Sequence, residues 1–228
     1  MISIVSSYFN DWELFTAWWI PCIEKHKNIE FIIVDDFSQE QKLVDVDFRA
    51  DNLKKFYITE DKKFNSHGAR NLGVSQASRQ TVFMTDIDAL PTDKLIRTVV
   101  KYRGKNVMVW PFWDEHKPSR FANTPCPNEF SVLRDKFVAI KGYDEEVAQH
   151  GGWFGDYWTR SNYISVYSPQ IIRKDTCYFL EEYNGDRLDH KIRDRELEAR
   201  IKNFVYDRNA RRDWSDKPWL SFAWERIE

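Results

Sequence analysis

Short apolar runs alternate with helical patterns along residues 1–112, and this alternation is the strongest constraint on the fold. Residues 31–34 (FIIV) form a continuous apolar run, which is typical of a strand buried on both faces. The other strand candidates are residues 2–6, 56–59, 81–85 and 107–112, and the helical patterns between them are residues 11–26, 67–78 and 93–103. Strands that alternate with helices form a mostly parallel sheet covered by helices. The sequence therefore predicts an α/β, Rossmann-like fold.

Acidic residues stand at the ends of two predicted strands. Asp36 follows the second strand, and Asp86 and Asp88 follow the fourth. Right-handed crossovers bring the carboxyl ends of the first, second and fourth strands to one edge, so these carboxylates should converge there with Arg70 from the preceding helical pattern. Mg²⁺ and Mn²⁺ prefer hard oxygen ligands and bridge carboxylates to substrate phosphates. Taken alone, Asp86 and Asp88 fit an Asp-rich turn equally well.

A Gly-rich aromatic segment in the second half, residues 150–158 (HGGWFGDYW), contains another candidate acid. Its glycines let a substrate approach the backbone closely, and Asp156 falls at the start of a predicted short helix. Surroundings that partly exclude water should raise the pKa of the Asp156 carboxyl towards the working range of a base. Asp156 is therefore a candidate general base. The competing interpretation is a turn in which Asp156 only caps the helix.

The remainder of the second half is less regular. We expect residues 113–128 to form a loop that covers the site, and residues 171–184 to return to β-structure. A charged helix from about residue 189 to residue 204 should present a solvated face. The tail, residues 214–228, carries three tryptophans and is expected to dock on the domain.

Composition narrows the class of protein. A chain of 228 residues suits a single domain, and a formal net charge of −2 gives no global field towards nucleic acid or an anionic membrane. The three cysteines are far apart, which argues against disulfides or a zinc site and for a reducing compartment. The chain opens on a strand rather than a signal peptide, and no apolar run reaches the roughly 18 residues of a membrane span. We therefore expect a cytoplasmic protein.

In sequence order, these segments resemble the GT-A glycosyltransferases of the family 2-like group. The matching blocks span roughly the first 160 residues and read Ser7-Tyr8-Phe9-Asn10, Val34-Asp35-Asp36-Phe37-Ser38, Gly68-Ala69-Arg70-Asn71-Leu72-Gly73, Asp86-Ile87-Asp88, Lys141-Gly142-Tyr143-Asp144-Glu145 and Trp153-Phe154-Gly155-Asp156. Two positions depart from the family's pattern. Gly155 stands where the family has Glu, and Phe37 where it has Gly.

The resemblance implies a single GT-A domain in which residues 1–112 bind the nucleotide sugar and residues 113–228 bind the acceptor. It further implies an inverting enzyme with a UDP-sugar donor and Mn²⁺ or Mg²⁺. Its implied donor-binding residues are Ser7, Asp36, Arg70, Asp86 and Trp153. Within that set Asp36 would meet the base, Arg70 the base and phosphate, and Asp86 the ribose.

The resemblance also assigns the metal and the base. Asp88 corresponds to the metal ligand of the Asp-x-Asp motif, and Asp156 corresponds to the general base. The place of a further metal ligand carries no His in this sequence, and Glu182 and His190 are the candidates for it.

Two other functions, a nucleotidyltransferase and a non-catalytic carbohydrate-binding protein, are alternatives to glycosyl transfer. A sugar-nucleotide-forming nucleotidyltransferase has a related sheet, but it usually carries a Gly-rich loop with Arg and Lys, which residues 6–11 lack. A non-catalytic carbohydrate-binding protein would have no need for acids at three strand ends. The acceptor stays open between a small molecule, a surface-polysaccharide precursor and a phage-type hydroxymethylated DNA base. A flipped base would need a positively charged approach, which the net charge does not indicate.

Overall fold

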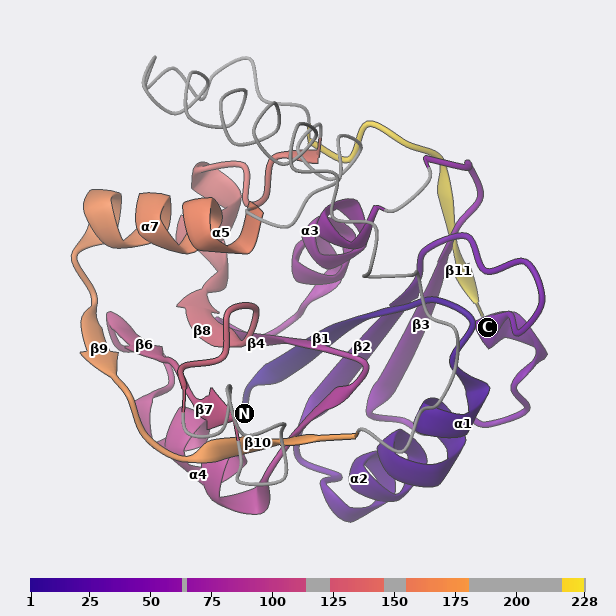
Figure 1. Cartoon of the computed structure of the whole chain (residues 1–228), viewed down its shortest axis with the longest axis horizontal. Coiled ribbons are helices and arrows are strands. Elements are labelled where there is room, and N and C mark those ends of the chain that lie inside the picture. Colours follow the sequence, from indigo (N-terminus) through magenta and orange to yellow (C-terminus); the bar gives the residue numbers. More distant parts are fainter. Residues whose placement is uncertain (63–64, 114–123, 146–154, 181–218, 228) are drawn as a thin grey trace.

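A six-stranded sheet forms the centre of the computed structural model, which describes residues 1–62, 65–113, 124–145, 155–180 and 219–227 (Figure 1). The strand order is β11-β3-β2-β1-β4-β8. The strands are β1 (Ser3–Tyr8), β2 (Glu30–Asp35), β3 (Leu53–Ile58), β4 (Thr81–Asp86), β8 (Phe130–Leu133) and β11 (Trp224–Ile227). β3, β2, β1 and β4 are parallel, whereas β8 and β11 pair antiparallel at the two edges. The predicted mostly parallel α/β fold is confirmed.

Two smaller sheets lie beside the main one. β5 (Ala89–Pro91), β10 (Thr176–Phe179) and β7 (Phe112–Trp113) form the first, and β6 (Val107–Val109) and β9 (Gln170–Ile172) form the second. The single strand predicted for residues 107–112 is therefore wrong, because the chain divides it between two sheets. The break falls at Trp110-Pro111, where proline has no N–H to donate to a ladder.

Helices cover both faces of the sheet. The bounds are α1 (Trp12–Leu14), the π-helix η1 (Phe15–Trp19), α2 (Ile20–Lys25), the 3₁₀ turn η2 (Leu43–Asp45), α3 (Ser66–Gln76), α4 (Asp93–Tyr102), α5 (Arg134–Ala139) and α7 (Gly155–Tyr167). Thr92 caps α4, since its Oγ1 accepts a hydrogen bond from the backbone N–H of Leu95 at 3.1 Å. A proline inside a helix, such as Pro21 in the predicted helix at residues 11–26, tends to kink or end it. Instead the π-helix just before Pro21 widens the turn, and helical structure continues to Lys25.

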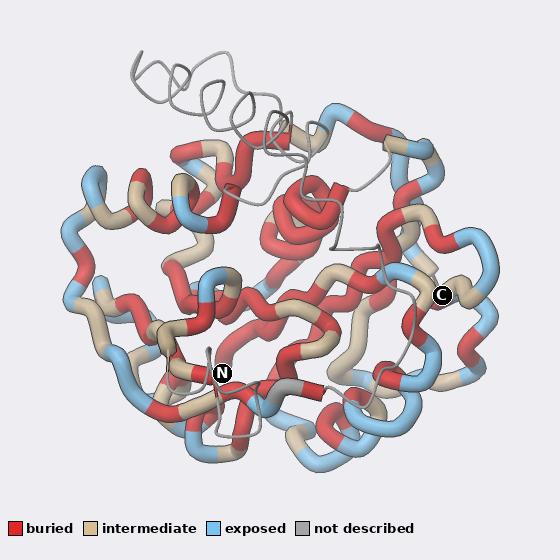
Figure 2. Tube along the Cα trace, viewed as in Figure 1, coloured by how far each residue is buried: buried red, intermediate tan, exposed pale blue. Residues whose placement is uncertain are grey.

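The core is divided between the two faces of the sheet. Ile4 packs in the cluster that includes residues of α2 and α4, whereas its neighbour Val5 packs in the cluster that includes residues of α3, α5 and α7. Successive strand residues point to opposite faces, so one short strand supplies both clusters. Figure 2 shows the inner strands and α3 as buried along nearly their whole length.

α3 packs closely on β1, which fixes the position of its first turns. A Cβ on Gly73 would lie only 2.4 Å from Cγ1 of Val5, so the approach depends on glycine at this position. A helix that connects parallel strands runs antiparallel to them, and its N-terminal turns therefore lie at the carboxyl edge of the sheet. Arg70 is carried to that edge by the second turn of α3.

Part of the C-terminal tail docks as expected. β11 pairs with β3, and the carboxylate of Glu145 accepts hydrogen bonds from the backbone N–H groups of Leu220 and Ser221 at 2.8 and 3.1 Å. The predicted helix at residues 189–204 lies outside the described residues, as does most of the predicted loop at residues 113–128. Among the described residues, no helix is long and apolar enough to cross a membrane.

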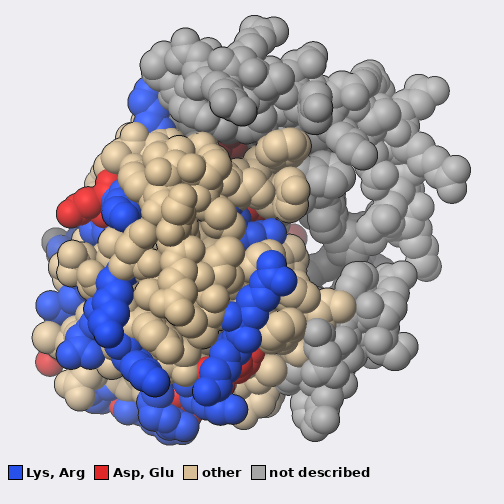
Figure 3. Space-filling model, turned by 90° about the vertical axis from the view of Figure 1, so that its left-hand side faces the viewer, with Lys and Arg blue, Asp and Glu red and all other residues tan. Residues whose placement is uncertain are grey.

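Basic side chains gather on one face of the molecule. Figure 3 views the molecule from the side on which α7 and β9 lie in Figure 1, and Lys and Arg side chains gather in the lower part of this view with few acidic side chains between them. The formal net charge of −2 is therefore compatible with a local cluster of basic side chains.

Candidate active site

The carboxyl ends of β1, β2 and β4 meet at one edge of the sheet, as predicted. Ser7 lies opposite Val34 on one side and opposite Asp86 on the other. Asp36 directly follows β2, and Asp88 lies in the turn between β4 and β5. The parallel register therefore places three of the predicted site residues on neighbouring strand ends and a fourth just beyond them.

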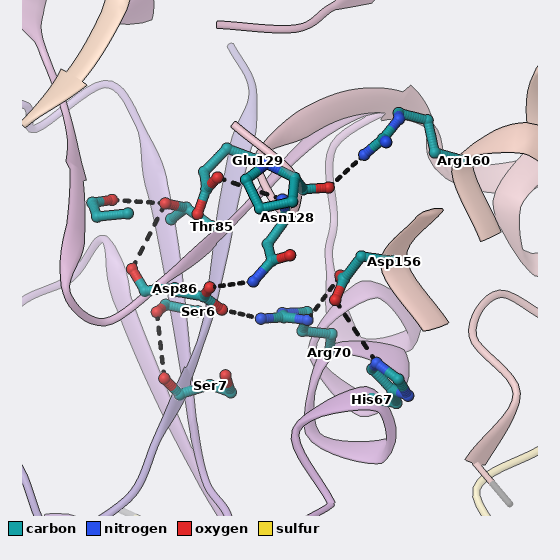
Figure 4. A network of polar contacts seen from close by, with 12 residues as sticks. Ser6, Ser7, His67, Arg70, Thr85, Asp86, Asn128, Glu129, Asp156 and Arg160 are labelled. Carbon is teal, nitrogen blue, oxygen red and sulfur yellow. Dashed lines mark hydrogen bonds and ion pairs between the residues drawn. The ribbon is translucent and has the colours of Figure 1, made fainter. Parts of the chain in front are cut away.

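Arg70 bridges two of the predicted carboxylates (Figure 4). Its Nη1 lies 2.9 Å from Oδ1 of Asp156, and its Nη2 forms an ion pair with Asp86. Only 2% of the Arg70 side chain is exposed, so the guanidinium is held between two acids away from bulk solvent. One cation thus links the end of β4 to the first turn of α7, and its contact with Asp156 joins residues 86 positions apart in sequence.

Asn128 also contacts Asp86, and sequence patterns gave no indication of it. Its Nδ2 donates to Oδ2 of Asp86 at 2.6 Å (Figure 4). Asp86 therefore receives hydrogen bonds on both carboxylate oxygens, one from Arg70 and one from Asn128. Asn128 follows Pro127 in an irregular segment without a periodic pattern, and only the folded chain reveals the contact.

The Asp156 carboxylate is held ionised in the free protein. Burial raises its pKa, but the charge of Arg70 and the neighbouring His67 outweigh burial and hold the pKa at about 2. The predicted upward shift is therefore wrong. Asp156 is indeed buried, yet the sequence could not show that a guanidinium lies within hydrogen-bond distance of its carboxylate.

His67 is a further site residue that the sequence patterns did not identify. Its Nε2 lies 3.6 Å from Oδ2 of Asp156, and 1% of its side chain is exposed. The His67 ring also explains Gly155, because a Cβ at position 155 would lie 1.9 Å from Cε1 of His67. The space that a side chain would need before Asp156 is filled by this imidazole.

The segment around Tyr143 packs against His67 and Arg70. Asn71 pairs with the Tyr143 backbone through two hydrogen bonds of 2.9 Å, and Gly142 adopts a positive φ of 45° just before it. The Tyr143 ring stacks on His67 with 5.0 Å between centroids, and Arg70 lies 5.5 Å from the same ring centroid. Asn71 thus fastens the second half of the chain to α3 beside the acids.

Asp36 occupies a separate buried position at the end of β2. Its Oδ2 accepts the backbone N–H of Asn65 at 2.7 Å. Burial raises the pKa of Asp36 to about 7, against this hydrogen bond and the more distant charge of Arg70. Asp36 and Asp156 are thus two buried carboxyls with pKa values on opposite sides of the ordinary value.

The remaining predicted site residues are only partly described. Trp153, Glu182 and His190 lie outside the described residues. No group of three or more His, Cys, Asp or Glu side chains that could hold a metal is present in the described part of the chain. Asp88, in the turn between β4 and β5, is the carboxylate to which the family resemblance assigns this role.

Two solved structures share this fold. One is S. aureus TarS residues 1–349, with a TM-score of 0.61 and 14% identity over 78% of this chain. The other is the mannosyltransferase PcManGT from Pyrobaculum calidifontis in complex with GDP-Man and Mn²⁺, with a TM-score of 0.60 and 15% identity over 95% of this chain. The chain spans 59% and 65% of these two proteins. No curated protein sequence matches it.

The strand order of the sheet and these structural likenesses show a GT-A fold. The model of the glycosyl transferase family 2 matches residues 3–167, which is most of the chain. The chain therefore belongs to glycosyltransferase family 2.

Proposed function

We propose that the protein is a metal-dependent, inverting glycosyltransferase that moves a sugar from a UDP-sugar to an acceptor hydroxyl. The observation that carries this proposal is the bridge Asp86–Arg70–Asp156 at the carboxyl edge of the sheet. It places a buried cation, suited to a diphosphate, directly beside a buried carboxylate, suited to accept a proton. Transfer of a sugar from a nucleotide diphosphate needs a cation beside the leaving diphosphate and a base beside the attacking hydroxyl.

The donor would lie across the strand ends. Asp36 would accept the base N–H, and Asp86 with Ser7 would hold the ribose. Arg70 would turn from the acids to the diphosphate, whose oxygens match its planar fork of donors. Trp153 stays a proposed member of this group from the family resemblance.

The pKa of Asp36 gives a test of its role in base recognition. Because this pKa is about 7, the ionised carboxylate that accepts a base N–H becomes scarce below neutrality. We expect the Kd for UDP to be roughly tenfold higher at pH 6 than at pH 8, as the ionised fraction falls by about that factor. Calorimetric titration of UDP at both pH values measures this. Asp36→Asn removes the titrating group and should bind with a Kd nearly independent of pH, whereas the same pH dependence in both proteins would contradict the assignment.

A divalent cation would be held by Asp88 together with the donor's phosphates. The residues fit such an ion, because Mg²⁺ and Mn²⁺ often bind through one or two carboxylates plus substrate oxygens and need no all-protein cage. The ion would neutralise charge on the leaving diphosphate. Glu182 and His190 remain the proposed sources of a further ligand. The likeness to PcManGT, which was solved with Mn²⁺, supports a divalent metal.

Asp88→Ala is expected to abolish the metal dependence of nucleotide binding. UDP should bind wild type at least about tenfold more tightly with Mn²⁺ than with a chelator, because the diphosphate must have its charge neutralised. The variant should show little difference between the two conditions. Asp93→Ala, an exposed carboxylate on α4, is the matched control. Equal affinity of wild type and Asp88→Ala with and without metal would exclude this role for Asp88.

In the proposed sugar transfer, each group of the site has one role. The acceptor oxygen attacks the anomeric carbon from the face opposite the diphosphate. A new C–O bond forms while the bond to the diphosphate oxygen breaks, and the configuration inverts. The acceptor proton passes to the carboxylate of Asp156. His67 and Tyr143 keep that carboxylate in place, and the donor draws Arg70 away from it.

A further inference from the structure

Phe37 has a backbone conformation that favours glycine. Its φ is 62°, in the left-handed region where a Cβ is crowded by the backbone. Asn10 in the adjacent loop has a similar φ of 51°, but Asn tolerates this region through its short polar side chain. A phenylalanine with positive φ is an outlier that persists only where surrounding contacts hold it. The aromatic ring is therefore present at an energetic cost to the free protein.

Hydrogen bonds on both sides of Phe37 prevent the loop from relaxing. The Asp35 carboxylate accepts the backbone N–H groups of Ser38 and Leu43 at 2.8 and 2.7 Å. The Asp36 backbone N–H donates to the Tyr8 carbonyl at 2.8 Å. The residue between these fixed points must adopt the positive φ. Glycine would satisfy the turn without strain, so the turn itself gives no reason for a phenylalanine.

The ring of Phe37 lies beside the base-recognition residue. It stacks on Tyr57, with 6.2 Å between ring centroids and 21° between ring planes. Tyr57 is the next-to-last residue of β3 and lies opposite Asp35 in the parallel register, so the pair stands at the same sheet edge as Asp36. Both rings are only partly buried. A flat aromatic surface therefore adjoins the buried carboxylate that directly precedes Phe37 in the chain.

We propose that the Phe37–Tyr57 pair is a stacking surface for the nucleobase of the donor. The proposal rests on the proposed function, in which Asp36 accepts the base N–H. Aromatic side chains stack on any base, because every base has a π-face, while hydrogen bonds at the base edge select among bases. The surrounding hydrogen bonds then hold Phe37 in its strained conformation, and the ring contributes to nucleotide binding rather than to stability.

The test compares three variants at position 37. Phe37→Gly removes the ring and relieves φ, Phe37→Ala removes the ring and keeps the strain, and Phe37→Tyr keeps an aromatic ring. UDP, GDP and inorganic pyrophosphate are titrated into each protein with Mn²⁺, and Tm is measured alongside. We expect Phe37→Gly and Phe37→Ala to bind the preferred nucleotide about tenfold more weakly, with pyrophosphate affinity unchanged and Phe37→Tyr close to wild type. We also expect Phe37→Gly to have the higher Tm of the two truncated variants.

The other outcomes distinguish failure of the proposed function from failure of the stacking surface. If wild type binds neither nucleotide nor pyrophosphate, the proposed function fails and the stacking surface fails with it. If wild type binds a nucleotide and Phe37→Gly binds it equally well, the stacking surface alone is wrong. Equal loss of UDP and pyrophosphate affinity would also overturn it, because a purely structural role of the ring affects the whole site.

Discussion

Asp156→Asn is expected to lower kcat by about 10²-fold or more without weakening donor binding. Asparagine keeps the shape of the side chain and can still accept a hydrogen bond from Arg70, but it cannot take the proton of the acceptor hydroxyl. The substitution therefore removes an interaction made only in the transition state, which lowers kcat and kcat/KM together.

The low pKa of Asp156 makes this prediction more specific. A carboxylate with a pKa of about 2 is fully ionised at neutral pH but is a weak base. Binding of the donor diphosphate to Arg70 would remove the main opposing charge, and the pKa of Asp156 should then rise in the complex. The donor would thus activate the base. In the free protein Asp156 is paired with Arg70, and this pairing would prevent proton transfer before the donor is bound.

Initial-rate kinetics with purified enzyme and a panel of nucleotide sugars measure the effect, and NMR of the product gives its anomeric configuration. Asp135→Asn is the control, since that carboxylate is 84% exposed and lies outside the site. Near-wild-type turnover by Asp156→Asn would remove it from the role of base. Retention of the donor's anomeric configuration would exclude the inverting mechanism, and Asp144, Glu145 and Asp114 would be the next acids to substitute.

The fold follows from local sequence patterns, which explains why it could be predicted. The run FIIV at residues 31–34 is apolar at every position, and in the structure every residue of β2 is buried between two helical layers. Arg70, Asp86 and Asp36 reach the same edge because parallel strands joined by helices must end together. The apolar periodicity of the sequence predicts the strands and helices, and the topology of such a fold predicts where the strands end.

The side-chain contacts that set the pKa of Asp156 and the geometry of the site could not be predicted from periodicity and topology. His67, Asn128 and Asp156 come from separate segments, and their distances depend on side-chain packing. The complementarity of Gly155 and His67 is visible only once the ring fills the space of the missing side chain. The pKa of Asp156 was mispredicted for the same reason. Burial was inferred correctly from its aromatic neighbours, but the sign of the shift was set by an ion pair with a residue far away in sequence.

Arg70→Met should destabilise the protein strongly, because it leaves Asp86 and Asp156 without their shared cation. Breaking a buried ion pair by removing one partner costs about 3–5 kcal/mol, since the remaining charge is uncompensated. The same loss corresponds to a Tm lower by roughly 10 °C or more in a chain of this size. Thermal and urea unfolding measure it. Lys25→Met is the matched control, because Lys25 pairs with Asp93 on the surface with 60% and 43% of the two side chains exposed, and exposed pairs contribute only about 0–1 kcal/mol.

The pH dependence of stability distinguishes the loss of the Arg70 charge from the loss of its packing. In wild type the pKa of Asp156 is depressed to about 2, so its contribution to stability is present above the unfolded-state value near 3.8 and is lost as pH falls through 2. In Arg70→Met the depression is gone, and protonation relieves the unpaired carboxylates. The stability gap between wild type and variant should therefore be widest near pH 7 and should narrow as pH falls towards 4. A gap that stays constant over this range would mean that the buried stem of Arg70, rather than its charge, stabilises the site.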